Sequence, residues 1–163
     1  MRAPVARTKR TVARRTAELL LCAAMAFGLS GCWPCGNKVV YEVHPPNRKH
    51  EAIVFVRNCG ATTDFSTHVS VVREGQSLSH GAGNALVVDG DHGKVKTGSC
   101  GQLPVHVAWN GDHSVAIRYP QESRRFLANT RAEGVALTYE ASPVSTLKPP
   151  DAPGCGNEAA QTR

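Results

Sequence analysis

The sequence lacks the features by which many enzymes and membrane proteins are recognised. Its longest apolar run, residues 19–27, is too short to span a bilayer, because a transmembrane helix needs about 20 apolar residues. It has no Gly-x-Ser-x-Gly motif, no Gly-x-Gly-x-x-Gly loop and no two histidines at His-x-x-x-His spacing. After residue 31 no stretch has helical periodicity. These absences argue against a transmembrane anchor, a serine-hydrolase elbow, a phosphate-binding loop and a helical zinc site.

The amino-terminal segment is first basic and then apolar. Residues 1–15 contain six Arg and Lys residues and no acid, and the apolar run at 19–27 follows. This order is typical of a cleaved export signal. The run ends in Leu29-Ser30-Gly31-Cys32, which resembles the lipobox of bacterial lipoproteins. The alternative is an ordinary secretory signal that happens to end near a cysteine.

The lipobox resemblance implies a signal peptide over residues 1–31 and lipidation of Cys32 by diacylglycerol and palmitate-like chains. Several chains anchor a protein firmly where one is marginal. Trp33 follows the cysteine, whereas Asp at this place tends to retain such proteins in the inner membrane. The resemblance therefore favours the cell envelope, at the outer membrane and facing the periplasm, with the membrane itself as one partner.

Removal of the leader changes the charge balance. Six of the 19 basic residues and one of the 13 acidic residues precede Cys32, which leaves 13 bases and 12 acids. A strongly basic chain would suggest a nucleic-acid partner. Because the excess positive charge belongs to the leader, we expect no nucleic-acid binding.

The cysteines remaining after export form an even set. Of six in the chain, Cys22 leaves with the leader and Cys32 carries the lipid; the others are Cys35, Cys59, Cys100 and Cys155. Four cysteines in an oxidising compartment indicate two disulfides, with three possible connectivities. We favour Cys35–Cys59 and Cys100–Cys155. Zinc would require two Cys-x-x-Cys pairs, and lipidation removes the only one.

The apolar residues of the mature chain alternate with a period of two, as in half-buried strands. This pattern occurs at Val39, Tyr41 and Val43 and again over 105–109, 115–119 and 135–139, and apolar runs at 52–56, 69–72 and 85–88 predict further strands. Turns are indicated by Pro45-Pro46-Asn47, Asn110-Gly111 and Arg131-Ala132-Glu133-Gly134.

These segments predict an all-β fold: a single small antiparallel meander, sandwich or open barrel of about seven strands, following a cleaved signal helix. The expected organisation is a lipidated tether at 32–38, an all-β domain at 39–141 and a proline-rich extended tail at 142–163.

One segment resembles a known group of proteins. The stretch Cys59-Gly-Ala-Thr-Thr-Asp-Phe-Ser-Thr67 is similar to a Cys-Gly-Ala-Thr-Thr-x-Phe-Ser-Thr segment of small exported bacterial lipoproteins of unknown function. A weaker resemblance extends from Cys35 to Tyr139, and Cys100 and Cys155 are not part of the common pattern. The resemblance supports export and implies no activity.

The same segment contains the best candidate ligand surface, formed by Thr63, Asp64, Ser66 and His68. The alternative is that its hydroxyl groups only hydrogen-bond the backbone of an irregular loop. Residues two apart on a strand are separated by about 6 to 7 Å, so we expect a direct Ser66–His68 hydrogen bond to be strained. We therefore expect no catalytic residues and no enzyme activity.

A weak metal candidate is the turn containing Asp89, Asp91 and His92, which offers oxygen and nitrogen ligands. A polar turn on the surface explains these residues equally well, so we expect neither a specific metal nor a cofactor.

Two functions remain open. The first is a noncatalytic module that binds or scaffolds an unknown envelope protein or cell-envelope component. The second is a periplasmic domain that binds a metal or small ligand, or a hydrolytic domain, using the 64–68 segment or the 89–92 loop. Convergence of these two segments on one concave pocket would favour the second, and their separation would favour the first.

Overall fold

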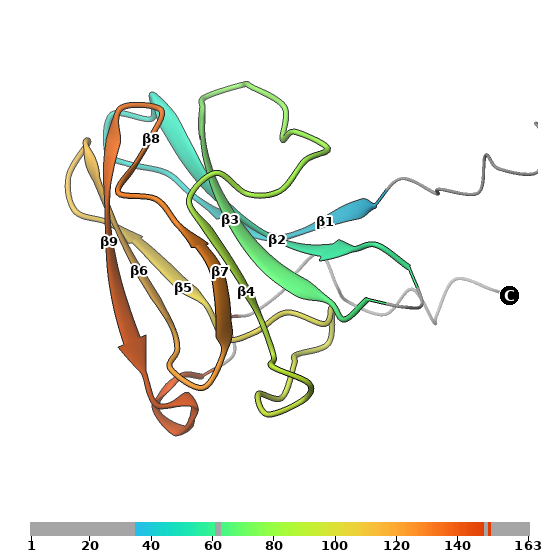
Figure 1. Cartoon of the computed structure of the whole chain (residues 1–163). Coiled ribbons are helices and arrows are strands. Elements are labelled where there is room, and N and C mark those ends of the chain that lie inside the picture. Colours follow the sequence, from blue (N-terminus) through green and yellow to red (C-terminus); the bar gives the residue numbers. More distant parts are fainter. Residues whose placement is uncertain (1–34, 61–62, 149, 151–163) are drawn as a thin grey trace, which may run out of the picture. The chain divides into compact units, whose positions relative to one another are not determined.

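The structure is a computed structural model, and it describes residues 35–60, 63–148 and 150 (Figure 1). These residues confirm the predicted all-β class. The strands are β1 (Gly36–Val43), β2 (His50–Asn58), β3 (Ser66–Arg73), β4 (Leu86–Asp89), β5 (His106–Trp109), β6 (Ser114–Pro120), β7 (Arg124–Ala128), β8 (Arg131–Ala132) and β9 (Val135–Ser142), followed by the 3₁₀ turn η1 (Val144–Thr146). No helix in this part of the chain is long and apolar enough to cross a membrane.

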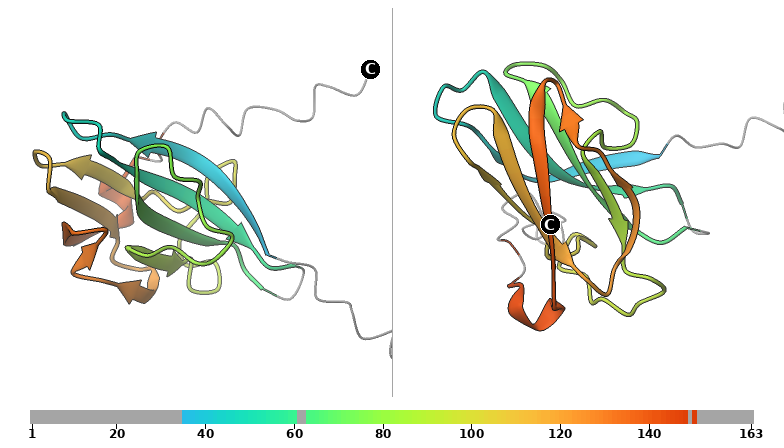
Figure 2. Two further views of the ribbon diagram at one scale, coloured as in Figure 1. Left: turned by 90° about the horizontal axis from the view of Figure 1, so that it is seen from above. Right: turned by 60° about the vertical axis from the view of Figure 1, so that its left-hand side comes forward.

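The strands form two sheets that pack against each other (Figures 1 and 2). Sheet A has the order β1-β2-β3-β4-β7, and sheet B has the order β5-β6-β9-β8. Within the described residues neither sheet closes on itself, so the architecture is a small sandwich.

The core lies between the inner faces of the two sheets. Sheet A contributes Val54, Val69 and Leu86, and sheet B contributes Val115 and Ile117; each is at most 1% exposed. Full burial of an aliphatic side chain contributes about 1.5–3 kcal/mol. In sheet B the alternating apolar residues Val115, Ile117, Val135 and Leu137 face this core, as the sequence pattern predicts.

Sheet A also buries apolar side chains on its outer face. Ile53, Phe55 and Val72 pack there with Val39 and Leu78. Leu78 belongs to the loop between β3 and β4, which therefore covers part of this face. The second layer explains why β2 and β3 have continuous apolar runs rather than alternation.

One predicted core position was wrong. Val39, Tyr41 and Val43 were expected to share a face, but the pairing of β1 with β2 shifts register between Val39 and Tyr41. This β-bulge turns Val39 to the outer cluster and places Val40, 2% exposed, in the core. An extra residue in one strand reverses the alternation beyond it.

The topology is richer than a simple meander. After β6 the chain crosses to the edge of sheet A as β7, and it then returns to sheet B as β8 and β9. As a result, β6 and β9 run parallel, whereas the other strand pairs of the described residues are antiparallel. Seven of the strands match the predicted ones, and β7 and β8 were not predicted.

The ends of the domain differ slightly from those expected. The first strand begins at Gly36, inside the expected tether, and Leu147, 6% exposed, is buried beyond the expected end at 141. The three predicted turns are present. Glu133 and Gly134, both with positive φ, connect β8 to β9 as a two-residue hairpin turn.

The predicted disulfide between Cys35 and Cys59 is confirmed. It lies next to the last paired residues of the β1–β2 hairpin, Gly36 and Asn58. Cys100 is also disulfide-bonded. Its expected partner, Cys155, lies outside the described residues, as does the lipidation site Cys32, so both assignments stay predictions.

Candidate functional site

Polar side chains form one line across the outer face of sheet A. Arg57 on β2 lies opposite Ser66 on β3, and Ser66 lies opposite Asp89 on β4. Asp89 in turn lies opposite Arg124 on β7. Their chain neighbours Val56 and Val88 face the core, so the alternation of a strand places this row outward.

A cavity of about 650 Å³ lies over this row. It joins the two candidate segments that the sequence placed apart, because both the 63–68 stretch and the 89–92 loop contribute to its wall. The lining residues are Arg57, Cys59, Thr63, Asp64, Ser66, His68, Ala82, Val87, Asp89, His92, Arg124 and Phe126. Convergence in one concave pocket is the arrangement expected of a ligand site.

Ser66 and His68 are directly hydrogen-bonded, with 2.8 Å between Ser66 Oγ and His68 Nε2. The expectation that this bond would be strained is therefore wrong. The strand spacing separates the Cβ atoms, but the imidazole ring is long enough to lean along the strand towards the shorter serine.

The backbone fixes the direction of this hydrogen bond. The amide N–H of Gly83 donates to Nδ1 of His68 at 2.9 Å, so Nδ1 carries no proton. Burial, aided by the nearby positive charge of Arg57, lowers the pKa of His68 to about 4. The neutral ring therefore carries its proton on Nε2 and donates it to Ser66.

This arrangement is the reverse of a catalytic dyad. A general base must accept the serine proton at Nε2 while its other nitrogen donates to an orienting group. Here Nε2 is already protonated and Nδ1 is an acceptor. His68 positions Ser66 and leaves the serine hydroxyl hydrogen free to point elsewhere.

Asp89 and Arg124 form a two-point ion pair in the wall. Arg124 Nε and Nη2 donate to the two carboxylate oxygens of Asp89 at 3.3 and 2.5 Å. Only 7% of the Asp89 side chain is exposed, and Oδ1 also accepts the amide N–H of Asp91 at 3.0 Å. The bond to Asp89 raises the pKa of Arg124.

The predicted metal candidates around this loop have other partners. Asp89 is bound by Arg124, and the carboxylate of Asp91 lies 2.5 Å from Lys94 Nζ. The hydrogen bond from Lys94 lowers the pKa of Asp91. His92 Nδ1 lies 4.0 Å from Asp64 Oδ2, and His92 Nε2 lies 3.5 Å from Arg124 Nη1. The loop is held together by these contacts, which supports its interpretation as a polar turn.

Arg57 is held at the opposite rim by the loop between β3 and β4. Its Nη1 lies within hydrogen-bonding distance of the carbonyl oxygens of His80 and Gly81, at 2.6 and 3.0 Å, and of Asn37 Oδ1 at 2.8 Å. These acceptors all engage one nitrogen of the guanidinium group. The arginine is therefore positioned by the loop, beside the cavity.

An aromatic ring borders the cavity on the β7 side. Phe126 is 58% exposed, and the guanidinium carbon of Arg124 lies 4.8 Å from its ring centroid. A largely exposed phenylalanine is unusual, since such rings are normally buried. It offers an apolar platform beside the polar row.

The four predicted surface residues all line the cavity, although they differ in role. Thr63 Oγ1 donates to the carbonyl of Gly60 at 3.2 Å, as the loop-stabilising alternative requires. Asp64 has a side chain 62% exposed. The sequence did not single out Arg57, Arg124 or Phe126 as site residues. If the strand predicted at 52–56 is continued by one residue, Arg57 lies on the face opposite to Val56. This was the one signal that could have placed Arg57 outward.

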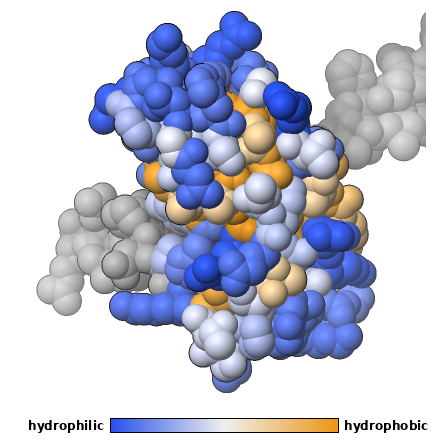
Figure 3. Space-filling model, turned by 90° about the vertical axis from the view of Figure 1, so that its left-hand side faces the viewer, coloured by the Kyte–Doolittle hydropathy of each residue, from blue (hydrophilic) through white to orange (hydrophobic). Residues whose placement is uncertain are grey.

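The outer face of sheet B offers a weaker alternative. Figure 3 shows an apolar band across the middle of the side of the molecule that faces left in Figure 1, with hydrophilic side chains above and below. A groove of about 500 Å³ on sheet B includes Ala108, Ala116 and Thr138, and its charged residues Arg118 and Glu140 pair with each other at 3.1 Å. This groove has fewer polar groups available to a ligand than the cavity on sheet A.

Comparison of the chain with protein-family models, with curated proteins and with solved structures gave no match, so the cavity must be interpreted from its own geometry.

Proposed function

We propose that the protein is a noncatalytic binding protein of the bacterial envelope, lipid-anchored at Cys32, which holds a small, uncharged, hydroxyl-rich ligand such as an envelope saccharide. The observation that carries this proposal is the convergence of the 63–68 and 89–92 segments on one cavity over sheet A. The lipobox at Cys32 supports the address.

The charges around the cavity favour a neutral ligand. Arg57 and Arg124 contribute two positive charges, and Asp64 and Asp89 contribute two negative charges. His68 is neutral at pH 7 because its pKa is about 4. With balanced charge, the pocket gives little electrostatic preference to anions or cations.

The hydrogen-bonding groups favour hydroxyls. Ser66 has a free hydroxyl hydrogen, Arg57 has nitrogens other than Nη1, and Asp64 has an exposed carboxylate. The site thus offers both donors and acceptors, as a group that both donates and accepts requires. Phe126 adds an apolar surface on which the carbon–hydrogen face of a sugar ring can pack.

Direct binding to soluble neutral oligosaccharides tests the ligand. We expect amide chemical-shift changes confined to the cavity wall, and we expect Phe126→Ala to weaken binding about tenfold, the effect of about 1.4 kcal/mol. The matched control is Phe65→Ala, which removes another exposed ring, 47% exposed, that does not line this cavity. Equal loss in both variants, or binding of charged oligosaccharides alone, would refute the proposal.

Lipidation is tested separately. Cys32→Ser should yield an unprocessed precursor that takes up no labelled palmitate. The control, Cys22→Ser, changes only a cysteine inside the leader and should be processed and labelled normally. Normal labelling of Cys32→Ser would contradict the anchor.

A further inference from the structure

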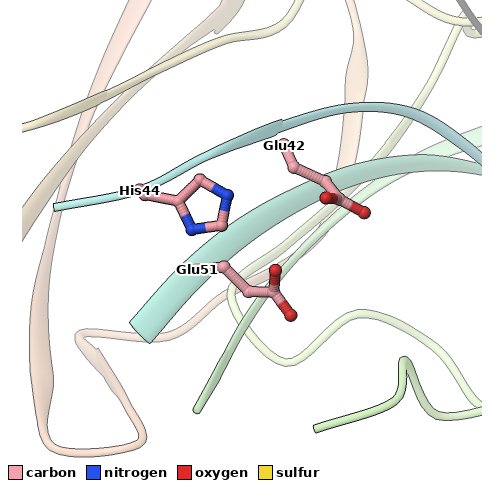
Figure 4. Close-up of side chains that lie close together, drawn as sticks. All are labelled: Glu42, His44 and Glu51. Carbon is pink, nitrogen blue, oxygen red and sulfur yellow. The ribbon is translucent and has the colours of Figure 1, made fainter. Parts of the chain in front are cut away.

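A second polar cluster lies away from the cavity, where β1 ends and β2 begins. Glu42 is on β1, His44 directly follows that strand, and Glu51 is on β2. One potential ligand atom from each of the three residues lies within 4.8 Å of the others. Figure 4 shows the imidazole ring and the two carboxyl groups around a common space.

The negative charges of this cluster are poorly compensated. Within the described residues, the carboxylates of Glu42 and Glu51 form neither an ion pair nor a hydrogen bond, and a third carboxylate, that of Glu74, lies beside His44. One imidazole thus stands among three carboxylates. Like charges at such short range repel each other, and a divalent cation would remove that repulsion.

The imidazole is oriented by its contact with Glu74. His44 Nδ1 lies 3.2 Å from Glu74 Oε2, at the start of the loop that follows β3. When Nδ1–H donates to this carboxylate, the lone pair of the neutral ring is on Nε2. Figure 4 shows that second nitrogen on the side of Glu42 and Glu51. A carboxylate that holds one nitrogen of a histidine while the other binds the ion is the usual outer shell of a protein metal site.

We propose that Glu42, His44 and Glu51 bind a divalent transition-metal ion, Zn²⁺ foremost, with Glu74 as the residue that positions His44. The ligand set decides the class of ion. Imidazole nitrogen suits zinc and its neighbours, whereas Ca²⁺ and Mg²⁺ prefer sites made only of oxygen. Zinc accepts both nitrogen and carboxylate oxygen, and water would complete its coordination.

The ion would join three segments of the outer face of sheet A. Glu42 on β1 and Glu51 on β2 lie on either side of the turn that His44 begins. Glu74 begins the loop that covers Ile53, Phe55 and Val72. Binding would therefore clamp that loop to the sheet edge. This inference does not depend on the proposed saccharide site, because the two groups of residues do not overlap.

The test is a Zn²⁺ titration of the oxidised protein, prepared without a histidine tag and followed by calorimetry and by the melting temperature. We expect one site per chain, a melting temperature that rises with Zn²⁺, and no comparable effect of Ca²⁺ or Mg²⁺. His44→Gln and the double variant Glu42→Gln/Glu51→Gln should abolish binding. Glu74→Gln should weaken it about 10- to 100-fold, as loss of an outer-shell partner does.

The matched control is His92→Gln, which removes a histidine beside an acidic residue in the cavity and should leave the Zn²⁺ affinity unchanged. Circular dichroism without metal should show that each variant keeps the β fold. Wild-type affinity in His44→Gln or in the double glutamate variant would overturn the proposal. So would the absence of any Zn²⁺ binding, or stronger binding of Ca²⁺ than of Zn²⁺.

Discussion

The buried imidazole of His68 should make the stability of the domain depend on pH. Its side chain is 3% exposed, and its pKa is about 4, compared with about 6.5 for an unfolded chain. Between these values the unfolded state binds a proton that the folded state does not. The contribution of His68 to stability is therefore complete above about pH 6.5 and is lost as the pH falls towards 4.

The size of this effect follows from the two pKa values. Each unit of difference corresponds to about 1.4 kcal/mol, so the complete loss is about 3.5 kcal/mol, and about 2.5 kcal/mol should already be lost at pH 4.5. Urea denaturation at a series of pH values measures it. In His68→Asn, whose side-chain oxygen can still accept the Gly83 N–H, this part of the pH dependence should disappear.

A matched variant separates His68 from the other histidines. His113 is exposed in the β5–β6 turn, so His113→Asn should keep the wild-type pH profile. Nitrogen shifts of the His68 ring should in addition identify the Nε2–H tautomer at pH 7. A ring that titrates near pH 6.5, or one protonated at Nδ1, would refute both the linkage and the argument against a catalytic dyad.

Three further substitutions test the packing around the site. Cys35→Ala/Cys59→Ala removes a disulfide with a sequence separation of 24, which should reduce the free energy of unfolding by about 3 kcal/mol in urea; a loss below about 1 kcal/mol would contradict the loop-closure argument. Thr67→Val removes the hydroxyl oxygen that accepts the buried Leu103 N–H at 2.8 Å, so it should lower the free energy of unfolding by about 1–3 kcal/mol. The control Thr138→Val changes a partly exposed hydroxyl and should alter the free energy of unfolding little. Gly83→Ala places a Cβ 2.6 Å from the Val69 carbonyl oxygen, so it should lower the free energy of unfolding by about 1–3 kcal/mol. As the loop moves away from the clash, the pKa of His68 should rise towards about 6.5. An unchanged pKa of His68 would show that this loop does not determine the pKa.

The sequence predicted the strands whose side chains alternate or are wholly apolar, because burial is what that pattern records. It did not predict β7, whose residues Arg124 and Phe126 are exposed at the edge of sheet A. The bulge after Val39 was also missed, since an inserted residue leaves no compositional trace. The Cys35–Cys59 pairing was predictable because each cysteine is adjacent to an end of one hairpin.

The candidate site was only half predictable. The segments around Ser66 and Asp89 were each identified, yet nothing in their spacing showed that β3 and β4 would align them. Side-chain direction was harder still. Hydrogen bonding of His68 depends on Gly83 in a distant loop, and the cluster of Glu42, His44 and Glu51 exists only after two strands and a turn are folded.

If the chain is anchored at Cys32 as we propose, the Cys35–Cys59 disulfide has a mechanical consequence. Tension from the membrane would enter the domain at Cys35 and, without the bond, would open the β1–β2 ladder one pair at a time from Gly36. This unzipping geometry resists force poorly, since few hydrogen bonds bear the load at once. Because Cys35 is joined to Cys59, the load bypasses β1 and reaches the chain where β2 leads towards β3. The edge strand β1 would then carry no tension, so a pull at the proposed anchor would not open the β1–β2 ladder.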